Sequence, residues 1–390
     1  MNDLKPQRIE SLDILKGLVM VIMALDHTRD YFHDQAFLFD PTDAKQTYFS
    51  LYFTRWITHY CAPIFALQAG ISAYLVGRRK SKKELTYFLL SRGIWLVFIE
   101  LTVVNFSWYF DIQFIALGLL VIWVLGMGMI FLAGVIHLPM KGILIISLLI
   151  MFGHNLLDYI SIEQNLLWSI VHQAELFLFE NGRALFVAYP LLPWIGVMSM
   201  GYYLGTYYDK LVPAEKRQKE FNIIGLSAVV LFFAIRLANS YGNFHPWEFY
   251  ESISDTLFSF FDPAKYPPSL TYLLMTLGPA MLFLANTEHV TGKVAEFIKV
   301  YGRVPFFYYI LHLYLIHLFA MALAEATGFG WESMILKTWV NESPELVGYG
   351  MNLGWTYLVW IAVVMILYLP CYKFSQYKMS HKEKKWLSYF

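Results

Sequence analysis

The chain has 390 residues, of which 58% are hydrophobic, 18% aromatic and 15% charged, and it carries no net charge. Its mean hydropathy of +0.49 indicates a polytopic membrane protein and excludes an ordinary pair of soluble domains. Zero net charge, with no basic block interleaved with aromatic residues, argues against binding of nucleic acid.

Apolar stretches long enough to cross a bilayer, about 20 residues each, recur along the whole chain. They predict an all-α, polytopic membrane protein with about ten transmembrane helices, built as one domain over residues 1–390. The predicted helices are 12–33, 50–77, 86–105, 112–135, 142–160, 184–207, 221–239, 269–288, 301–325 and 352–372. No small-residue cleavage site follows the first run, so we expect a membrane span there and not a signal peptide.

The basic residues predict the orientation of these helices. Most of the 29 lysines and arginines fall in connections on one side, among them Lys5, Arg8 and the run from Arg78 to Lys83. The positive-inside rule therefore places both termini in the cytoplasm. The outward connections are longer, acidic and aromatic, which suits either a surface for a polar ligand or the topology alone. They are 34–49, 106–111, 161–183, 240–268 and 326–351.

The first predicted helix is unusually polar for a membrane span. Its polar and small residues follow steps of three and four and so share one face: Asp13, Gly17, Met20, Ala24, His27 and Asp30. At 1.5 Å per residue, His27 lies roughly 22 Å beyond the inner end, in the outer leaflet. Charged groups are costly in a bilayer, so we expect this face to serve a function.

The second predicted helix brings more polar groups to a similar depth, because Arg55 and His59 lie one turn apart on it. Together with Asp26, His27 and Asp30 they are expected to converge below the outer surface as an acid–base site. In this hypothesis a neighbouring carboxylate fixes the tautomer of His27, and Arg55 neutralises a carboxylate.

Some of these polar residues also have a purely structural interpretation. His59 alone suits a hydrogen bond between helices, and Arg29 and His33 suit ordinary interfacial positions. No HExxH pattern or close His/Cys pairing is present, so no metal site is predicted.

Three further polar residues lie deeper in predicted helices. Arg92 follows the Arg78–Lys83 run by two turns, where a guanidinium either binds a phosphate from the cytoplasm or snorkels to the interface. Glu100, at mid-membrane, requires a partner. His312 is expected near the midplane, on the same helix face as Tyr308.

Short motifs follow one another along nearly the whole chain. They are Arg8-x-x-Ser11-x-Asp13-x-x-Lys16-Gly17, Asp26-His27-x-x-Asp30, His59-x-x-Ala62-Pro63-x-Phe65-x-x-x-Ala69-Gly70, Pro193-Trp194-Ile195-Gly196 with Gly201-Tyr202-x-x-Gly205, Tyr266-Pro267-Pro268-Ser269 with Leu277-Gly278-Pro279, and Gly302-Arg303-x-Pro305. In this order and spacing, the chain resembles the heparan-alpha-glucosaminide N-acetyltransferase catalytic-domain family in its short bacterial form. Lys16 stands where the family usually has Arg. The opening motif is also similar to that of membrane acyltransferases that O-acylate bacterial surface sugars, which favours His27 as the essential histidine.

The resemblance implies acetyl transfer across the bacterial inner membrane by a multi-pass protein embedded in lipid. Acetyl-CoA would be the co-substrate from the cytoplasm, bound by Arg92, Lys16, Arg303 and His312. The acceptor would be an amine or hydroxyl of an extracytoplasmic glycan or glycolipid.

The resemblance also implies roles for the outer residues. His27 would act as the base or as a transient acyl carrier, oriented by Asp26 or Asp30, with Arg55, His59 or a backbone amide near the thioester oxygen. Lysosomal members carry their catalytic histidine in a loop after this helix, so His33 and His59 remain alternatives to His27.

A proton-coupled transporter is the competing interpretation. In it, the intramembrane residues would form a proton or ion relay, and no binding of CoA is expected. The relay would use Asp13, Asp26, His27, Glu100 and His312. The sequence leaves the oligomeric state open, a homo-oligomer included.

Overall fold

The computed structural model describes residues 9–389, and helices dominate them. The predicted inward residues Lys5 and Arg8 lie outside the described residues. The helices are α1 (Glu10–Phe32), α2 (Phe49–Thr58), α3 (Cys61–Gly77), α4 (Lys82–Ile99), α5 (Asn105–Tyr109), α6 (Val121–Val135), α7 (Met140–Gly153), α8 (Leu166–Val171), α9 (Leu191–Leu204), α10 (Ala214–Ala238), α11 (Ile253–Phe260), α12 (Leu270–Asn286), α13 (Lys293–Arg303), α14 (Pro305–Ala326) and α15 (Leu353–Ser380).

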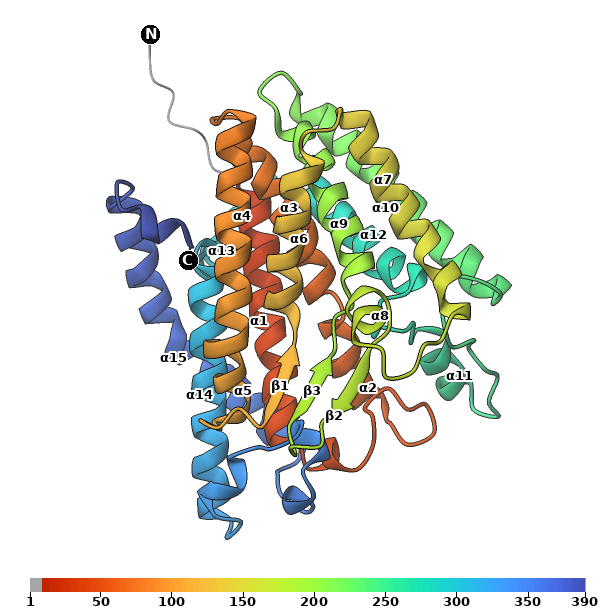
Figure 1. Ribbon diagram of the computed structural model, residues 1–390, viewed down its shortest axis with the longest axis vertical. Helices are drawn as coiled ribbons and strands as arrows, with labels where there is room; N and C mark the ends of the chain where they lie inside the picture. The colour runs from red at the N-terminus through yellow and green to blue at the C-terminus, as the bar shows by residue number, and fades with distance from the viewer. Residues whose placement is uncertain (1–8, 390) are drawn as a thin grey trace.

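The long helices lie side by side along the long axis of the molecule (Figure 1). Among residues 9–389, six segments are long and apolar enough to cross a membrane: Phe49–Gly77, Lys82–Tyr109, Met140–Tyr159, Ala214–Ala238, Pro305–Ala326 and Leu353–Ser380. Helices α6 and α12 are apolar but shorter. Helix α1 has the length of a span, but its charged residues, Asp13 and Lys16 among them, keep it out of this set. A membrane protein is thereby supported, and a count of ten spans stays a prediction.

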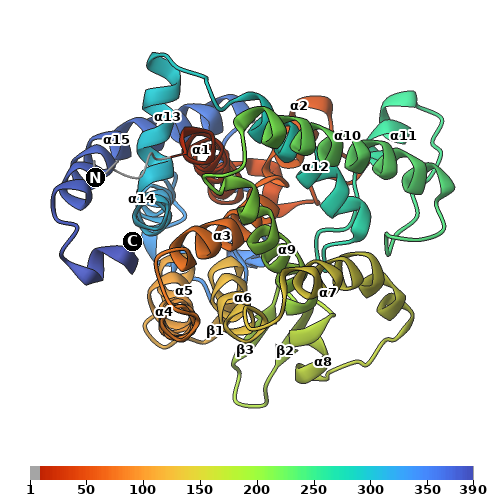
Figure 2. The same cartoon turned by 90° about the horizontal axis from the view of Figure 1, so that it is seen from above.

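Helix α1 is the central helix of the bundle. It contacts α2, α3, α12, α13, α14 and α15, and the view from above shows it among them (Figure 2). Most of its residues are buried, including the polar Asp13, Asp26, Thr28, Arg29 and Asp30. The predicted polar face of this helix therefore lies inside the protein.

A three-stranded sheet corrects the all-α prediction. Strands β1 (Ala116–Leu119), β3 (Ala184–Val187) and β2 (Glu175–Leu178) lie in this order, with β3 parallel to β1 and antiparallel to β2. The predicted spans 112–135 and 184–207 thus each contain a strand, β1 and β3, before the helices α6 and α9. Their residues are apolar like the helices that follow, so hydropathy alone does not separate strand from helix.

Two other predicted spans are interrupted at prolines. Pro305 is the first residue of α14, so the residue before it leaves the helical conformation and α13 ends at Arg303. Pro63 has no N–H for the carbonyl of His59, four residues earlier. That carbonyl accepts a hydrogen bond of 2.7 Å from the Tyr272 hydroxyl instead. His59 and Tyr60, between α2 and α3, keep helical backbone angles, so Phe49–Gly77 remains one membrane-length segment.

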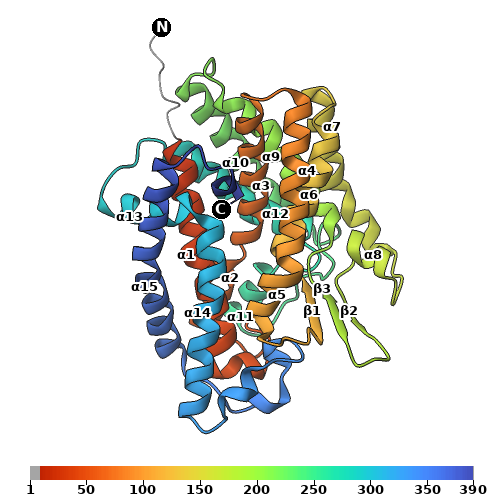
Figure 3. The same cartoon turned by 60° about the vertical axis from the view of Figure 1, so that its left-hand side comes forward.

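The basic connections gather at one end of the bundle. The α3–α4, α6–α7 and α9–α10 connections and the end of α15 lie at the upper end in Figures 1 and 3, opposite the sheet. Arg78 in the α3–α4 connection pairs with Asp209 in the α9–α10 connection at 2.9 Å. Lys299 of α13 pairs with Glu10 at the start of α1 at 3.0 Å. This arrangement agrees with the predicted inward side, which we call the inner end.

Two pairs of glycines bring helices into backbone contact. A Cβ on Gly17 would lie 2.0 Å from the carbonyl oxygen of Ile298, and one on Gly302 would lie 2.0 Å from that of Asp13. Gly70 and Gly201 do the same between α3 and α9. A Cβ on Gly70 would lie 2.0 Å from the carbonyl oxygen of Met198, and one on Gly201 would lie 2.1 Å from that of Leu67. These motif glycines therefore serve close helix packing.

Candidate functional site

Two cavities enter the bundle from opposite ends. The inner cavity has a volume of about 1230 Å³ and is bounded by α1, α3, α4, α6, α14 and α15. Apolar side chains make most of its wall, and eight basic residues line it: Lys16, Arg79, Lys80, Lys83, Arg92, Lys378, Lys382 and Lys384. The carboxylate of Glu84 also lines it, but this group already caps α4 through Ser81. The inner cavity is thus an apolar pocket with a cationic mouth.

The outer cavity is smaller, about 460 Å³. Charged residues, His27 and aromatic residues line it: Asp26, His27, Arg29, Asp30, Arg55, Lys265, Trp108, Tyr189, Tyr266 and Trp339. We call the charged part the floor and the aromatic part the walls. Val121, at the start of α6, and Tyr309, on α14, line both cavities. The two cavities therefore meet at these two side chains, in the interior of the bundle.

His27 lies at this meeting point. Its ring is 6.5 Å from that of Tyr309 and 4.8 Å from that of Trp108, which it meets edge to face. Its Nδ1 lies 2.7 Å from Nε2 of His312 on α14. The Nδ1 of His312 in turn lies 3.0 Å from the carbonyl oxygen of Tyr308. His312 itself is fully buried and lies behind His27, away from the cavity walls.

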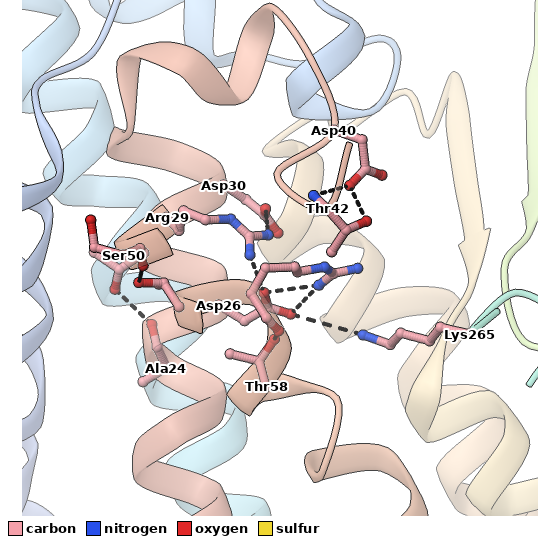
Figure 4. Close-up of polar contacts among 12 residues, drawn as sticks. Ala24, Asp26, Arg29, Asp30, Asp40, Thr42, Ser50, Thr58 and Lys265 are labelled. Carbon is pink, nitrogen blue, oxygen red and sulfur yellow. Dashed lines mark hydrogen bonds and ion pairs between the residues drawn. The ribbon is translucent and has the colours of Figure 1, made fainter. Parts of the chain in front are cut away.

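Beside His27, Asp26 holds a buried cluster of charges (Figure 4). Arg55 donates to both its oxygens at 2.9 and 2.8 Å. Arg29 pairs with Asp26 at 2.9 Å and with Asp30 at 2.6 Å, and the Lys265 ammonium lies 4.0 Å from Asp26. Such bidentate, charge-assisted contacts fix the geometry of the cavity floor.

The outer loops position the remaining polar groups. Ser269 caps α12, and His154 Nε2 lies 2.8 Å from the carbonyl oxygen of Pro268, so the loop that carries Lys265 is tied down at its end. Asp40 lies on another outer loop. Burial alone would raise the pKa of Asp40, but Arg55 and hydrogen bonds from Thr42 hold it below its usual value.

The structure brings together four of the five predicted catalytic residues, Asp26, His27, Asp30 and Arg55, in one cavity. The predicted contact between a carboxylate and His27 is wrong, because His27 Nδ1 contacts His312 and both carboxylates bind arginines. Asp26 and His27 are consecutive on a helix, where side chains point about 100° apart.

His59 does not reach the outer cavity. Its ring meets Tyr272 edge to face at 5.6 Å, and its Nδ1 has no hydrogen-bond partner among residues 9–389. The interfacial interpretation of Arg29 and His33 is wrong, since their exposed fractions are only 3% and 1%.

Of the predicted acetyl-CoA ligands, Lys16 and Arg92 line the inner cavity. The Arg92 guanidinium lies over the rings of Phe88 and Tyr389, at 5.6 and 5.7 Å. Arg303 pairs with Glu296 at 3.7 Å and lies away from both cavity walls.

Glu100 has the partner that sequence reasoning required. It is fully buried, and its Oε2 accepts a hydrogen bond of 2.9 Å from the backbone N–H of Trp123 in the first turn of α6. The carboxylate thus caps α6, whose first residue, Val121, lines both cavities. The described residues contain no cluster of three His, Cys, Asp or Glu side chains suited to a metal ion.

Sequence reasoning missed Trp108, Tyr309 and Lys265 as site residues. Trp108 and Tyr309 are aromatic residues of a kind common in membrane helices, so their residue type did not mark them as site residues. Lys265 did offer one, because it is an isolated lysine in an acidic, aromatic outer loop and precedes the stiff Tyr266-Pro267-Pro268 segment.

A comparison with protein-family models identifies a family for this chain. The family described as heparan-alpha-glucosaminide N-acetyltransferase, catalytic, matches the chain over residues 8–236. This segment is more than half of the 390 residues and includes α1 to α9 and all but the last two residues of α10. No curated protein matches the chain.

Proposed function

Because the chain belongs to the heparan-alpha-glucosaminide N-acetyltransferase catalytic-domain family, we propose that it transfers an acetyl group across a membrane. The donor is cytoplasmic acetyl-CoA, and the acceptor is an amine or hydroxyl of an extracytoplasmic sugar or glycolipid. All ten predicted segments cross the bilayer in this proposal, with both termini in the cytoplasm.

One observation supports this proposal above the others: the two cavities that enter from opposite ends meet beside His27, at Val121 and Tyr309. A donor in one cavity and an acceptor in the other would meet there without either crossing the membrane. Such a meeting point also brings both reactants together at once, which favours direct transfer.

The inner cavity suits the donor. Phosphates of CoA would bind the cationic mouth, where Arg92, Arg79 and Lys83 offer charge-assisted hydrogen bonds. The long, mostly uncharged pantetheine arm would follow the apolar wall toward Tyr309. The volume, about 1230 Å³, exceeds the usual 300–1,000 Å³ of pockets for small ligands.

The outer cavity suits a polar acceptor. Its aromatic walls, Tyr189, Tyr266 and Trp339, offer flat faces to a sugar ring, and its floor is polar. His27 would take the proton from the acceptor as the new bond to the acetyl carbon forms and the carbon–sulfur bond breaks. The proton then passes to the departing CoA thiolate. Arg55 and Lys265 would stabilise negative charge on the reacting carbonyl oxygen.

The transporter alternative has less support in the contacts. Glu100 is bound to the backbone of α6, and Asp26 is bound by Arg55 and Arg29. These carboxylates are therefore held in fixed contacts and not spaced along a relay.

The test is calorimetric binding of acetyl-CoA to the purified protein. We expect micromolar binding by the wild type, a loss of at least about 10-fold in Arg92→Ala from the missing charge-assisted contact, and little change in His27→Ala. Lys219→Ala is the matched control, because Lys219 is exposed at the inner end outside the cavity. No binding of acetyl-CoA or longer acyl-CoAs by a folded wild type would contradict the proposal and direct work to proton transport in liposomes.

A further inference from the structure

The pair of imidazoles at the meeting point has a geometry that fixes its protons. The rings of His27 and His312 are nearly parallel, 14° apart, with centroids 4.9 Å apart and facing nitrogens at 2.7 Å. The ring centroids are much farther apart than the two facing nitrogens. The nitrogens therefore lie between the two rings and point at each other in the ring planes. This is a hydrogen bond and not a face-to-face stack.

The protons on the two rings can be assigned one after the other, starting from the carbonyl oxygen of Tyr308 and ending at His27. The carbonyl oxygen of Tyr308 only accepts, so the Nδ1 of His312, at 3.0 Å, must carry a hydrogen. His312 is fully buried and its described polar contacts include no carboxylate, so its uncharged form is favoured. Its Nε2 is then a bare acceptor.

It follows that His27 donates through Nδ1 to His312 and keeps its lone pair on Nε2. Among the described residues the His27 ring makes its one side-chain hydrogen bond through Nδ1, to His312, and His27 lines the outer cavity. The unprotonated nitrogen of His27 is therefore the one available to an acceptor.

We propose that His312 is the positioning residue of His27: it selects the Nδ1–H tautomer and holds Nε2 ready as the base. This inference rests on the proposed function for the identity of the reaction. A neutral imidazole here does the orienting work for which many enzymes use a carboxylate. It does so without adding a negative charge to the interior of a membrane protein, where each charge is costly.

The neighbouring His317 shows what a structural histidine on the same helix looks like. It is as fully buried as His312, but its two nitrogens face the backbone oxygens of Ser107 and Met334. It lines neither cavity and has no contact with His27 among the described interactions. His317 is therefore a matched control for burial, helix and residue type.

The kinetic test compares His312→Leu, His312→Gln and His317→Gln, each corrected for the folded fraction. We expect kcat to fall about 10–100-fold in His312→Leu, the usual cost of losing an orienting partner, with little change in KM for acetyl-CoA. His312→Gln, which can accept from His27 through its amide oxygen, should recover part of this loss. His317→Gln should lower the melting temperature without lowering kcat in the same way.

The spectroscopic test does not depend on activity. In protein labelled with ¹⁵N-histidine, the signals of His27 are assigned by their loss in His27→Gln. We expect a protonated Nδ1 and a bare Nε2 in the wild type, and a mixture of tautomers in His312→Leu.

The outcomes are distinct. A bare Nδ1 on wild-type His27, or a His312→Leu enzyme with kcat within about threefold of the wild type, would overturn the role of His312. A wild type that transfers no acetyl group to any acceptor would contradict the proposed function alone, because the tautomer measurement still decides the positioning role.

Discussion

At the scale of residues, the site depends on charges that neutralise one another inside the protein. Asp26 accepts from Arg55 and pairs with Arg29, with Lys265 nearby. Burying an ion pair costs desolvation, and removing one partner leaves the other charge uncompensated. Asp26 is therefore more important to folding than its place in a catalytic motif suggests.

We expect Asp26→Asn to lower stability by about 3–5 kcal/mol, because it leaves buried cations without their carboxylate. The double variant Asp26→Asn/Arg55→Gln should recover part of this loss, since it also removes one of the cations. Asp209→Asn is the control: its pair with Arg78 is about one-third exposed and should contribute about 0–1 kcal/mol. Unfolding curves in detergent measure all three, and equal losses in Asp26→Asn and Asp209→Asn would contradict the expectation.

A pH effect is expected from Asp262, on the loop before Lys265. Burial, with the charge of Asp40, raises the pKa of Asp262 from 3.8 to about 7. The folded protein then binds more protons than the unfolded one between these values, so stability from this group is present below about pH 4 and is lost as pH rises through 7.

The melting temperature of the wild type should therefore fall more between pH 5 and pH 8 than that of Asp262→Asn. Glu251→Gln, which changes an exposed carboxylate nearby, should follow the wild type. Parallel pH curves for the wild type and Asp262→Asn would refute this assignment.

Sequence could place these residues only in part. The spacing of Asp26, His27 and Asp30 on one helix predicted a shared site, and the structure places them in one cavity. The partner of His27 was not predictable, because His312 lies 285 positions away and only the packing of α14 on α1 brings it near.

At the scale of elements, the family motifs are largely places where helices touch. Gly17 and Gly302 join α1 to α13, and Gly70 and Gly201 join α3 to α9. Because α1 carries His27 and Lys16, its fit against α13 also sets the position of residues in both cavities.

We expect Gly17→Ala to destabilise the protein by about 1–3 kcal/mol. The added methyl carbon would overlap the backbone of Ile298, which cannot move away as a flexible side chain could. Gly134→Ala is the matched control: it lies in α6 with open space around its Cβ position, and should gain about 0.5–1 kcal/mol from helix propensity. Thermal unfolding in detergent measures both. A neutral Gly17→Ala would show that α1 and α13 can separate without cost.

Hydropathy predicted where most helices lie but not where they break. The interruptions at Pro63 and Pro305 follow from local chemistry visible in the sequence. The strands β1 and β3 could not be separated from α6 and α9, because Ala-Leu-Gly-Leu and Ala-Leu-Phe-Val are as apolar as the helices they lead into.

At the scale of the whole molecule, the distribution of basic residues predicted the two ends of the bundle. The connections that carry them do lie together, and the sheet and long loops lie opposite. Composition could not predict that two cavities would meet, since this depends on the packing of six helices around one space.

Cysteine labelling in intact cells tests the proposed orientation. Leu211 is exposed at the inner end and Phe249 on an outer loop, while Cys61 and Cys371 are buried. We expect a membrane-impermeant thiol reagent to label Phe249→Cys from outside and to leave Leu211→Cys and the wild type unlabelled. Labelling of both variants from the same side would contradict the topology.

The wall shared by Val121 and Tyr309 has an electrical consequence. A passage open from one face to the other would leak ions, so an energised membrane requires that these side chains stay closed around whatever occupies the cavities. In the proposed reaction the phosphates stay inside, the acetyl group moves outward formally as CH3CO⁺, leaving a thiolate, and the acceptor's proton moves inward to that thiolate. Each unbalanced charge that crossed would gain or lose about 2.3 kcal/mol per 100 mV. This exchange leaves no unbalanced charge, so the membrane voltage neither drives nor opposes the overall transfer.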